Sequence, residues 1–222
     1  MEWGILAVTG IFVLVGYIVL QGTRASMAWR KAASGGDVDV IRQILEDAIA
    51  SWRSVKRPKE IAPDVWRGVQ SVALVDVASG SAPTGASLGA SVSCQVESEY
   101  RLLDGRWIEV SNPLQEGFAV TARLADMLLY DVPNLRLDAF RIDVHTTFRD
   151  ADGTAERSCI LSTDVRREVA RGVDWEQWTA AEIVDAFGGR YRLGERGVAL
   201  PVEPLESAVA PEPGDLPVPP RR

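Results

Sequence analysis

An uninterrupted apolar run near the N-terminus constrains this chain more than any other feature. Residues 3–20, WGILAVTGIFVLVGYIVL, contain no charged side chain. As a helix rising 1.5 Å per residue, this segment spans roughly 27 Å, about the hydrocarbon thickness of a bilayer. The run is apolar on all sides, which disfavours a helix buried along one stripe in a soluble core. We therefore expect residues 1–33 to form a transmembrane anchor with its juxtamembrane segment.

The charges around the run predict its orientation. Cations follow it closely, whereas only the amino group and Glu2 precede it. Because cations favour the cytoplasmic side, we expect an outside N-terminus and a cytoplasmic domain on a plasma or inner membrane. Aromatic rings at the two ends of the run suit the interfacial belts. The expected membrane-anchoring residues are Trp3, Tyr17, Arg24, Arg30 and Lys31.

A cleaved secretory signal is the competing interpretation of the same run. Such signals have a positive n-region, an apolar core of about 7–15 residues and a small-x-small cleavage site. Ser26–Ala28 resembles the site, but the n-region is not positive and the apolar core is too long. These features favour a retained anchor.

Composition divides the rest of the chain into one domain and a tail. Residues 37–200 have the size of a single soluble domain with a hydrophobic core. Residues 201–222 hold seven of the twelve prolines, and we expect a disordered Pro-rich tail there. Pro217–Pro220 can form a polyproline II segment for a partner, although an inert solvated tail is the simpler interpretation.

Charge and residue counts exclude several kinds of site. The net charge of −7 argues against nucleic-acid binding, which needs a concentrated basic face. One basic stretch, residues 53–59, is either a solvated helix end or a contact with anionic lipid headgroups. His145 is the only histidine, and Cys94 and Cys159 stand far apart. We therefore expect no metal and no cofactor, and two reduced thiols that point into the core.

Hydrophobic periodicity predicts the order of the secondary structure. Residues 38–54 carry one apolar stripe at helical spacing after the N-cap residue Asp37. Asn112 caps a second helix, and Thr179 opens a third through a capping box with Glu182. The expected elements are helix 38–54, strands 69–77, 92–102 and 107–110, helix 113–130, a strand over 140–148 with a partner after the turn at 150–153, and a helix that starts at 180.

Two strand registers follow from these patterns. Pairing Arg149 with Thr154 places Val144 opposite Cys159. The hairpin around Asp104–Gly105 allows two registers. A two-residue turn pairs Tyr100 with Glu109, and a three-residue loop pairs Tyr100 with Ile108; we favour the second because it keeps the apolar faces together. The fold class expected from all of this is α+β, with an antiparallel sheet of about five strands and helices packed on one face.

One group of residues resembles a catalytic site. In the expected register Ser158 lies across from His145 on the outward face, and Asp143 is two residues along the same strand. Serine, histidine and aspartate form nucleophilic triads, so these three are the catalytic candidates. However, Asp143 and His145 are about 7 Å apart at the backbone, and nothing indicates an oxyanion hole. A solvated polar row explains them better.

A second pattern suggests calcium. Residues 150–153 read Asp-Ala-Asp-Gly, but an EF-hand loop starting at Asp150 would need glycine at Ala155 and glutamate at Leu161. We expect a hairpin turn there instead.

Three functions remain, in decreasing order of support. The first is a membrane-anchored, non-enzymatic scaffold or binding domain whose partners are the lipid bilayer and another membrane or peripheral protein. The second is a domain that holds a small apolar ligand or lipid between helix 113–130 and the sheet. The third is a hydrolase that uses the outward sheet face.

Overall fold

The computed structural model describes residues 31–32, 35–82, 85–97, 100–103, 106–109, 112–132, 135, 137–149 and 155–206. The apolar run and Trp3, Tyr17, Arg24 and Arg30 lie outside these residues, as do the turn at 150–153 and residues 207–222. Lys31 is described and its side chain is exposed. Among the described residues, no helix has the length and apolar character needed to cross a bilayer.

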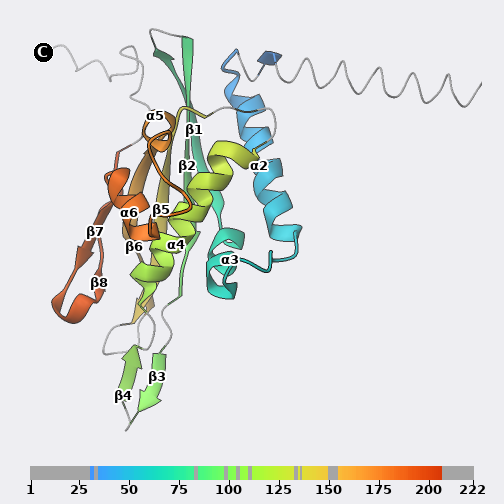
Figure 1. Cartoon of the computed structure of the whole chain (residues 1–222). Helices are drawn as coiled ribbons and strands as arrows, with labels where there is room; N and C mark the ends of the chain where they lie inside the picture. Colours follow the sequence, from blue (N-terminus) through green and yellow to red (C-terminus); the bar gives the residue numbers. More distant parts are fainter. Residues whose placement is uncertain are drawn as a thin grey trace, which may run out of the picture.

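The described elements follow one another as an α+β arrangement (Figure 1). The helices are α2 (Val38–Ser54), α3 (Pro63–Gln70), α4 (Pro113–Asp126), the π-helical turn η1 (Met127–Asp131), α5 (Arg167–Ala170), α6 (Ala180–Ala186) and the 3-10 turn η2 (Glu195–Gly197). The strands are β1 (Ala73–Ala82), β2 (Gly85–Gln95), β3 (Tyr100–Leu103), β4 (Arg106–Glu109), β5 (Ala139–Arg149), β6 (Ala155–Arg166), β7 (Arg190–Leu193) and β8 (Ala199–Leu200).

The main sheet has six strands in the order β1-β2-β5-β6-β7-β8. Strands β2 and β5 run parallel and the other neighbours run antiparallel, so the sheet is mixed. The expectation of an antiparallel sheet is therefore wrong for one pairing. The reason is the long connection from β2 to β5, which contains α4 and can return the chain to the end of the sheet where β2 begins.

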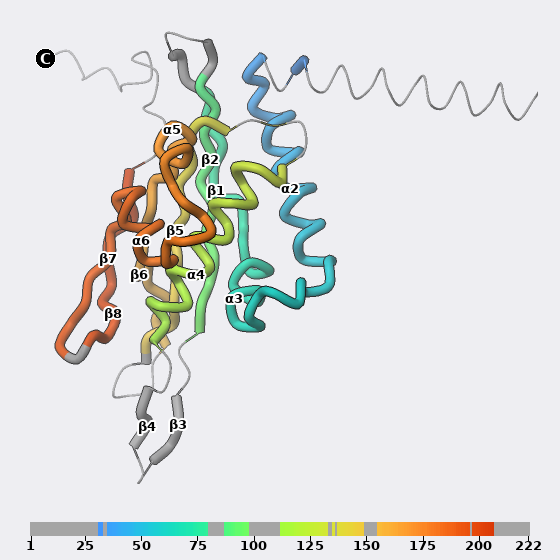
Figure 2. The backbone as a smooth tube through the Cα atoms, in the orientation of Figure 1, coloured from blue at the N-terminus to red at the C-terminus, as the bar shows by residue number. Residues whose placement is uncertain are grey.

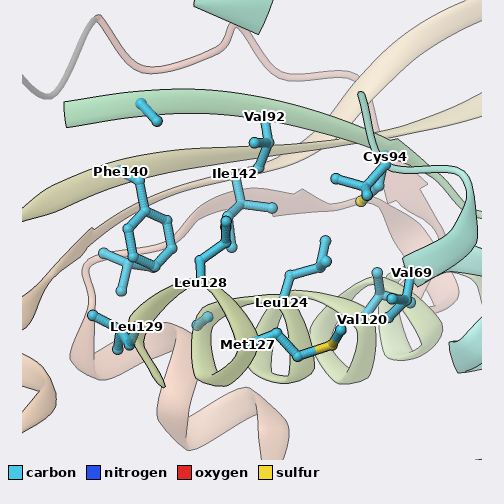
Figure 3. Close-up of a cluster of buried hydrophobic side chains, with 14 of the residues drawn as sticks. Val69, Val92, Cys94, Val120, Leu124, Met127, Leu128, Leu129, Phe140 and Ile142 are labelled. Atoms are coloured by element: carbon cyan, nitrogen blue, oxygen red, sulfur yellow. The ribbon is translucent and has the colours of Figure 1, made fainter. Parts of the chain in front are cut away.

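Helix α4 packs across the sheet at the centre of the core. It contacts α3 on one side and α6 on the other, and it faces β5 and β6 (Figure 2). Leu124 and Leu128 point from α4 toward the sheet, Leu128 toward Ile142 of β5 (Figure 3), and Leu124, Leu128, Phe140 and Ile142 are all fully buried. We call this side of the sheet the helix face.

The helix caps and the apolar stripe that were predicted from neighbouring residues are confirmed. The Asp37 carboxylate accepts hydrogen bonds from the backbone N–H groups of Asp39 and Val40, and the whole predicted stripe of α2 is buried. Thr179 and Glu182 form the expected capping box of α6. Helix α4 begins at Pro113 after its cap Asn112, as predicted.

The region before β1 differs from the prediction. Helix α3 covers residues 63–70, where the sequence was expected to lead into a strand from residue 69. Pro63 at the first helical position and Asp64 in the first turn are helix-start signals, and Trp66 and Val69 form the buried side. Strand β1 begins only at Ala73. Packing against α4 stabilises this short helix in place of the strand.

The favoured hairpin register is wrong and its alternative is correct. Tyr100 pairs with Glu109, and Leu103 with Arg106, which leaves two residues for the connection. Strands β3 and β4 form their own two-stranded sheet. This register agrees with the general preference of hairpins for a two-residue connection over a longer loop.

A β-bulge changes the register of β5 and β6. Val144 pairs with Leu161, whereas the next residue, His145, pairs with Cys159. The bulge thus inserts Ile160 between two otherwise regular stretches. The expected register is wrong from the turn onward. Arg149 pairs with Ala155 and not with Thr154, and the bulge adds a second residue of shift, so Val144 pairs with Leu161 and not with Cys159.

The close approach of α3 to α4 gives the first prediction. A Cβ atom added to Gly68 would overlap Cγ2 of Val120, a β-branched residue with restricted rotamers. We expect Gly68→Ala to lower the free energy of unfolding by about 1–3 kcal/mol through overpacking. Urea denaturation followed by circular dichroism measures the change.

Gly117→Ala is the matched control in α4. Its Cβ would lie 3.4 Å from Cγ1 of Val144, an ordinary contact, so this variant is expected to keep the stability of the parent. Equal stability of the Gly68→Ala protein and the parent would contradict the packing described here.

Candidate functional site

The side of the sheet turned away from the helices carries the polar side chains, and we call it the polar face. Residues paired across strands share a face, and the polar residues of β5 alternate with Phe140, Ile142 and Val144 of the helix face. The polar face therefore comprises Ser91, Ser93 and Gln95 of β2, Arg141, Asp143 and His145 of β5, Cys159, Ser162 and Asp164 of β6, and Arg190 of β7.

The chain's own C-terminal residues bind to this face. The segment Pro201–Glu206, here named the C-terminal strap, follows β8 and makes main-chain contacts with β5 and β6. The Val202 N–H donates to the carbonyl oxygen of Cys159 at 2.8 Å, and the Leu205 N–H donates to Oγ of Ser162 at 2.9 Å. Nη1 of Arg141 donates to the carbonyl oxygen of Leu205 at 2.5 Å. These contacts extend the folded part of the chain to Glu206.

A buried ionic network lies beneath the strap. Asp143 is only 4% exposed, and Ser162 is fully buried. Oγ of Ser162 donates to Oδ1 of Asp143 at 2.6 Å, and Nε of Arg141 lies 3.0 Å from Oδ2 in an ion pair. Each of the three residues thus has a polar partner in the network, and two of them also contact Leu205. The network joins the sheet to the strap.

The three catalytic candidates are not brought together as a triad. In the register that begins with Arg149 opposite Ala155, Ser158 pairs with Thr146, which belongs to the helix face, and His145 pairs with Cys159. The expected position of Ser158 across from His145 is therefore wrong. The carboxylate of Asp143 binds Ser162 and Arg141. The polar row is also not simply solvated, since Asp143 and Ser162 are buried.

Two hollows flank the strap on the polar face. The larger, of about 690 Å³, is open to solvent and is lined by His145, Arg157, Ser158, Cys159, Arg190, Arg192 and strap residues 201–204. The smaller, of about 450 Å³, is lined by Asp164, Arg166, Arg190 and strap residues 203–206. Arg190 and the strap belong to both, so the strap divides the polar face into two adjoining depressions.

The environment of the larger hollow shifts the pKa of two of its groups. Burial lowers the pKa of His145, and the positive charge of Arg157 lowers it further, whereas the charge of Asp143 acts in the opposite direction. Burial, followed by the charge of Asp143, raises the pKa of the Cys159 thiol to about 11. At neutral pH the imidazole is therefore uncharged and the thiol stays protonated.

The two cysteines lie on opposite faces of the sheet. Cys94 pairs with Val144 and points into the core beneath α4, as expected (Figure 3). Cys159 lies beside His145 on the polar face, so the expectation that it points into the core is wrong; the observed register places it opposite His145 and not opposite Val144. Both thiols are free and buried. Burial also raises the pKa of Cys94.

Over the described residues, no group of three or more His, Cys, Asp or Glu side chains is placed to hold a metal ion.

The amino-acid sequence predicted the polar row of β5 but not the strap that binds to it. A signal for the strap is present, since Val202 and Leu205 place apolar side chains among the prolines and acids that follow β8.

No protein-family model, no curated protein and no solved structure matches this chain.

Removal of the Asp143 carboxylate is expected to destabilise the fold. Asp143→Ala leaves the Arg141 guanidinium, whose side chain is 15% exposed, without its ion-pair partner. We expect the free energy of unfolding to fall by about 3–5 kcal/mol, as for other buried pairs that lose one member. Urea denaturation of the full chain in detergent measures it.

Asp164→Ala is the control on the same face. Its ion pair with the exposed Arg166 is expected to contribute less than about 1 kcal/mol. If Asp143→Ala and Asp164→Ala lowered the free energy of unfolding equally, the buried network would stabilise the fold no more than an exposed ion pair does, which would contradict this prediction.

The single histidine allows a clean test of pH dependence. The folded-state pKa of His145 lies below its unfolded value, so the unfolded chain binds more protons as the pH falls below about 6.5. Stability should therefore decrease on acidification until the pH passes the folded-state pKa. We expect the parent to lose more stability between about pH 7.5 and 5.5 than His145→Gln. Urea denaturation at both pH values measures the loss of stability. Equal losses in the parent and in His145→Gln would refute the lowered pKa of His145.

Proposed function

We propose that this chain is a single-pass membrane protein whose cytoplasmic domain is a non-enzymatic binding module for another membrane or peripheral protein. The apolar run of residues 3–20 and the cations that follow it support the anchor and its orientation. On this proposal the polar face of the sheet takes an extended segment of the partner.

The observation that carries this proposal is the C-terminal strap. It lies on the polar face, and its polar contacts with β5 and β6 use main-chain atoms of Val202 and Leu205. Contacts to main-chain atoms do not depend on the identity of the bound side chains, as in other modes of strand recognition. The same groups therefore suit an extended segment of a second protein.

The edge of β6 next to Cys159 is suited to strand addition. Strand β7 pairs with β6 at Leu161 and Ser162, and the strap continues along that edge through the bond from Val202 to Cys159. The strap thus occupies a place where a further strand fits. We infer that the strap is the chain's own occupant and that the partner segment displaces it.

Packing beneath α4 weighs against the alternative of a small apolar ligand. Side chains from α4 and β5 fill the described space between helix and sheet, and Val120, Leu124 and Leu128 are fully buried there (Figure 3). Gly117 brings the α4 backbone close to Val144 and Leu161. A ligand at this place would have to separate side chains that now contact one another. Ser158 pairs with Thr146 and not with His145, and Asp143 binds Arg141 and Ser162, which weighs against a hydrolase.

Site-specific photocrosslinking tests the binding function. A photoreactive amino acid at Arg166, an exposed residue beside the strap, should give a discrete heavier adduct in native membranes. The same amino acid at Gln43, exposed on α2, is the control and should give none. Adding Ser162→Ala, which removes the acceptor for Leu205, should increase the adduct because the strap is held less firmly. Absence of an adduct at Arg166, or identical adducts at both positions, would contradict the proposal.

Protease treatment tests the membrane placement separately. On intact cells, protease added outside should leave the domain intact, and it should digest the domain once the membrane is opened. An intact mass that includes residues 1–20 would support a retained anchor. Digestion of the domain on intact cells, or a mature form that begins near Trp29, would overturn the orientation or the anchor.

A further inference from the structure

Three arginines surround the larger hollow on the polar face. Arg157 comes from β6, and Arg190 and Arg192 come from β7. Arg190 and Arg192 are two residues apart on one strand, so they share a face, and all three side chains are exposed. Adjacent strands thus bring three guanidinium groups to the rim of one depression.

The positive charge of this cluster has no ion-pair partner within the described part of the chain. No carboxylate of a described residue lies within 4 Å of the charged nitrogens of Arg157, Arg190 or Arg192. Arg190 donates only to the main-chain oxygen of Glu203, at 3.4 Å. Glu203 lines the hollow and is the one acidic residue that does so. The lining therefore carries three cations against one anion.

The charge of Arg157 affects the pKa of the neighbouring His145. His145 lines the same hollow, and after burial the charge of Arg157 is the next largest cause of its lowered pKa. Like charges gathered on one surface repel one another, and an anion between them removes that repulsion. A guanidinium has five N–H donors in a planar fork, which suits an oxyanion with several acceptor oxygens.

We propose that this hollow is an oxyanion-binding site, in which Arg157, Arg190 and Arg192 hold a phosphate or carboxylate group beside the strap. The volume of about 690 Å³ leaves room for more than the anionic group. The group belongs either to a small free anion or to a side chain of an extended partner segment. The site goes beyond the proposed function, because it requires neither a partner nor displacement of the strap.

Titration of the full chain with inorganic phosphate tests the site. Isothermal titration calorimetry in detergent, with chloride balancing the ionic strength, should show saturable binding. The double variant Arg157→Gln/Arg192→Gln should bind phosphate about tenfold more weakly or worse, because charge-assisted hydrogen bonds are lost. Both residues are exposed and lack ion-pair partners, so this variant should fold like the parent.

The control removes two positive charges elsewhere. Arg171→Gln/Lys59→Gln changes exposed residues outside the hollow and should leave the affinity unchanged. Equal losses in the two double variants would show a general charge effect, and no saturable binding to the parent would show that there is no site. Either result would overturn the proposal.

A second titration distinguishes the sources of the anion. The probe is a short extended peptide with one phosphoserine, compared with its unphosphorylated form. Tighter binding of the phosphopeptide than of phosphate, lost in Arg157→Gln/Arg192→Gln, assigns the oxyanion to a partner segment. Binding equal to that of phosphate assigns it to a free anion. If phosphate binds but photocrosslinking at Arg166 gives no adduct, the oxyanion site stands without the proposed function.

Discussion

The buried ion pair between Arg141 and Asp143 determines how the polar face is organised. An isolated carboxylate cannot be taken out of water without a large penalty, so the almost fully buried Asp143 needs strong partners. Arg141 and Ser162 supply them, and both also bind Leu205 of the strap. The same two residues that stabilise the charge therefore also hold a peptide on the sheet.

The two faces of the sheet consequently have different roles. The helix face packs against α4 through aliphatic and aromatic side chains and provides most of the core. The polar face holds the ionic network, the strap and the two hollows. Between β5 and β6, Cys159 lies opposite His145 on the polar face and Ser158 opposite Thr146 of the helix face, and the bulge at Ile160 then places Leu161 opposite Val144 on the helix face.

Local signals in the sequence were sufficient for much of the fold and insufficient for the site. The stripe of α2, the cap at Asn112 and the capping box at Thr179 are properties of neighbouring residues, and each was predicted correctly. The parallel pairing of β2 with β5 and the bulge depend on residues distant in sequence, and alternation alone does not reveal them. The polar row of β5 was identified, but the strap that contacts it was not, because its few apolar residues among prolines resemble a disordered tail.

Amide hydrogen exchange of the full chain measures whether the strap is held on the polar face. If the strap is bound as described, the N–H of Leu205 should exchange at least about tenfold more slowly than in an unstructured peptide of the same sequence. Ser162→Ala should remove most of that protection, whereas the core amides of α4 should keep theirs. Exchange of Leu205 at the unstructured rate in the parent protein, or protection that survives Ser162→Ala, would contradict the account.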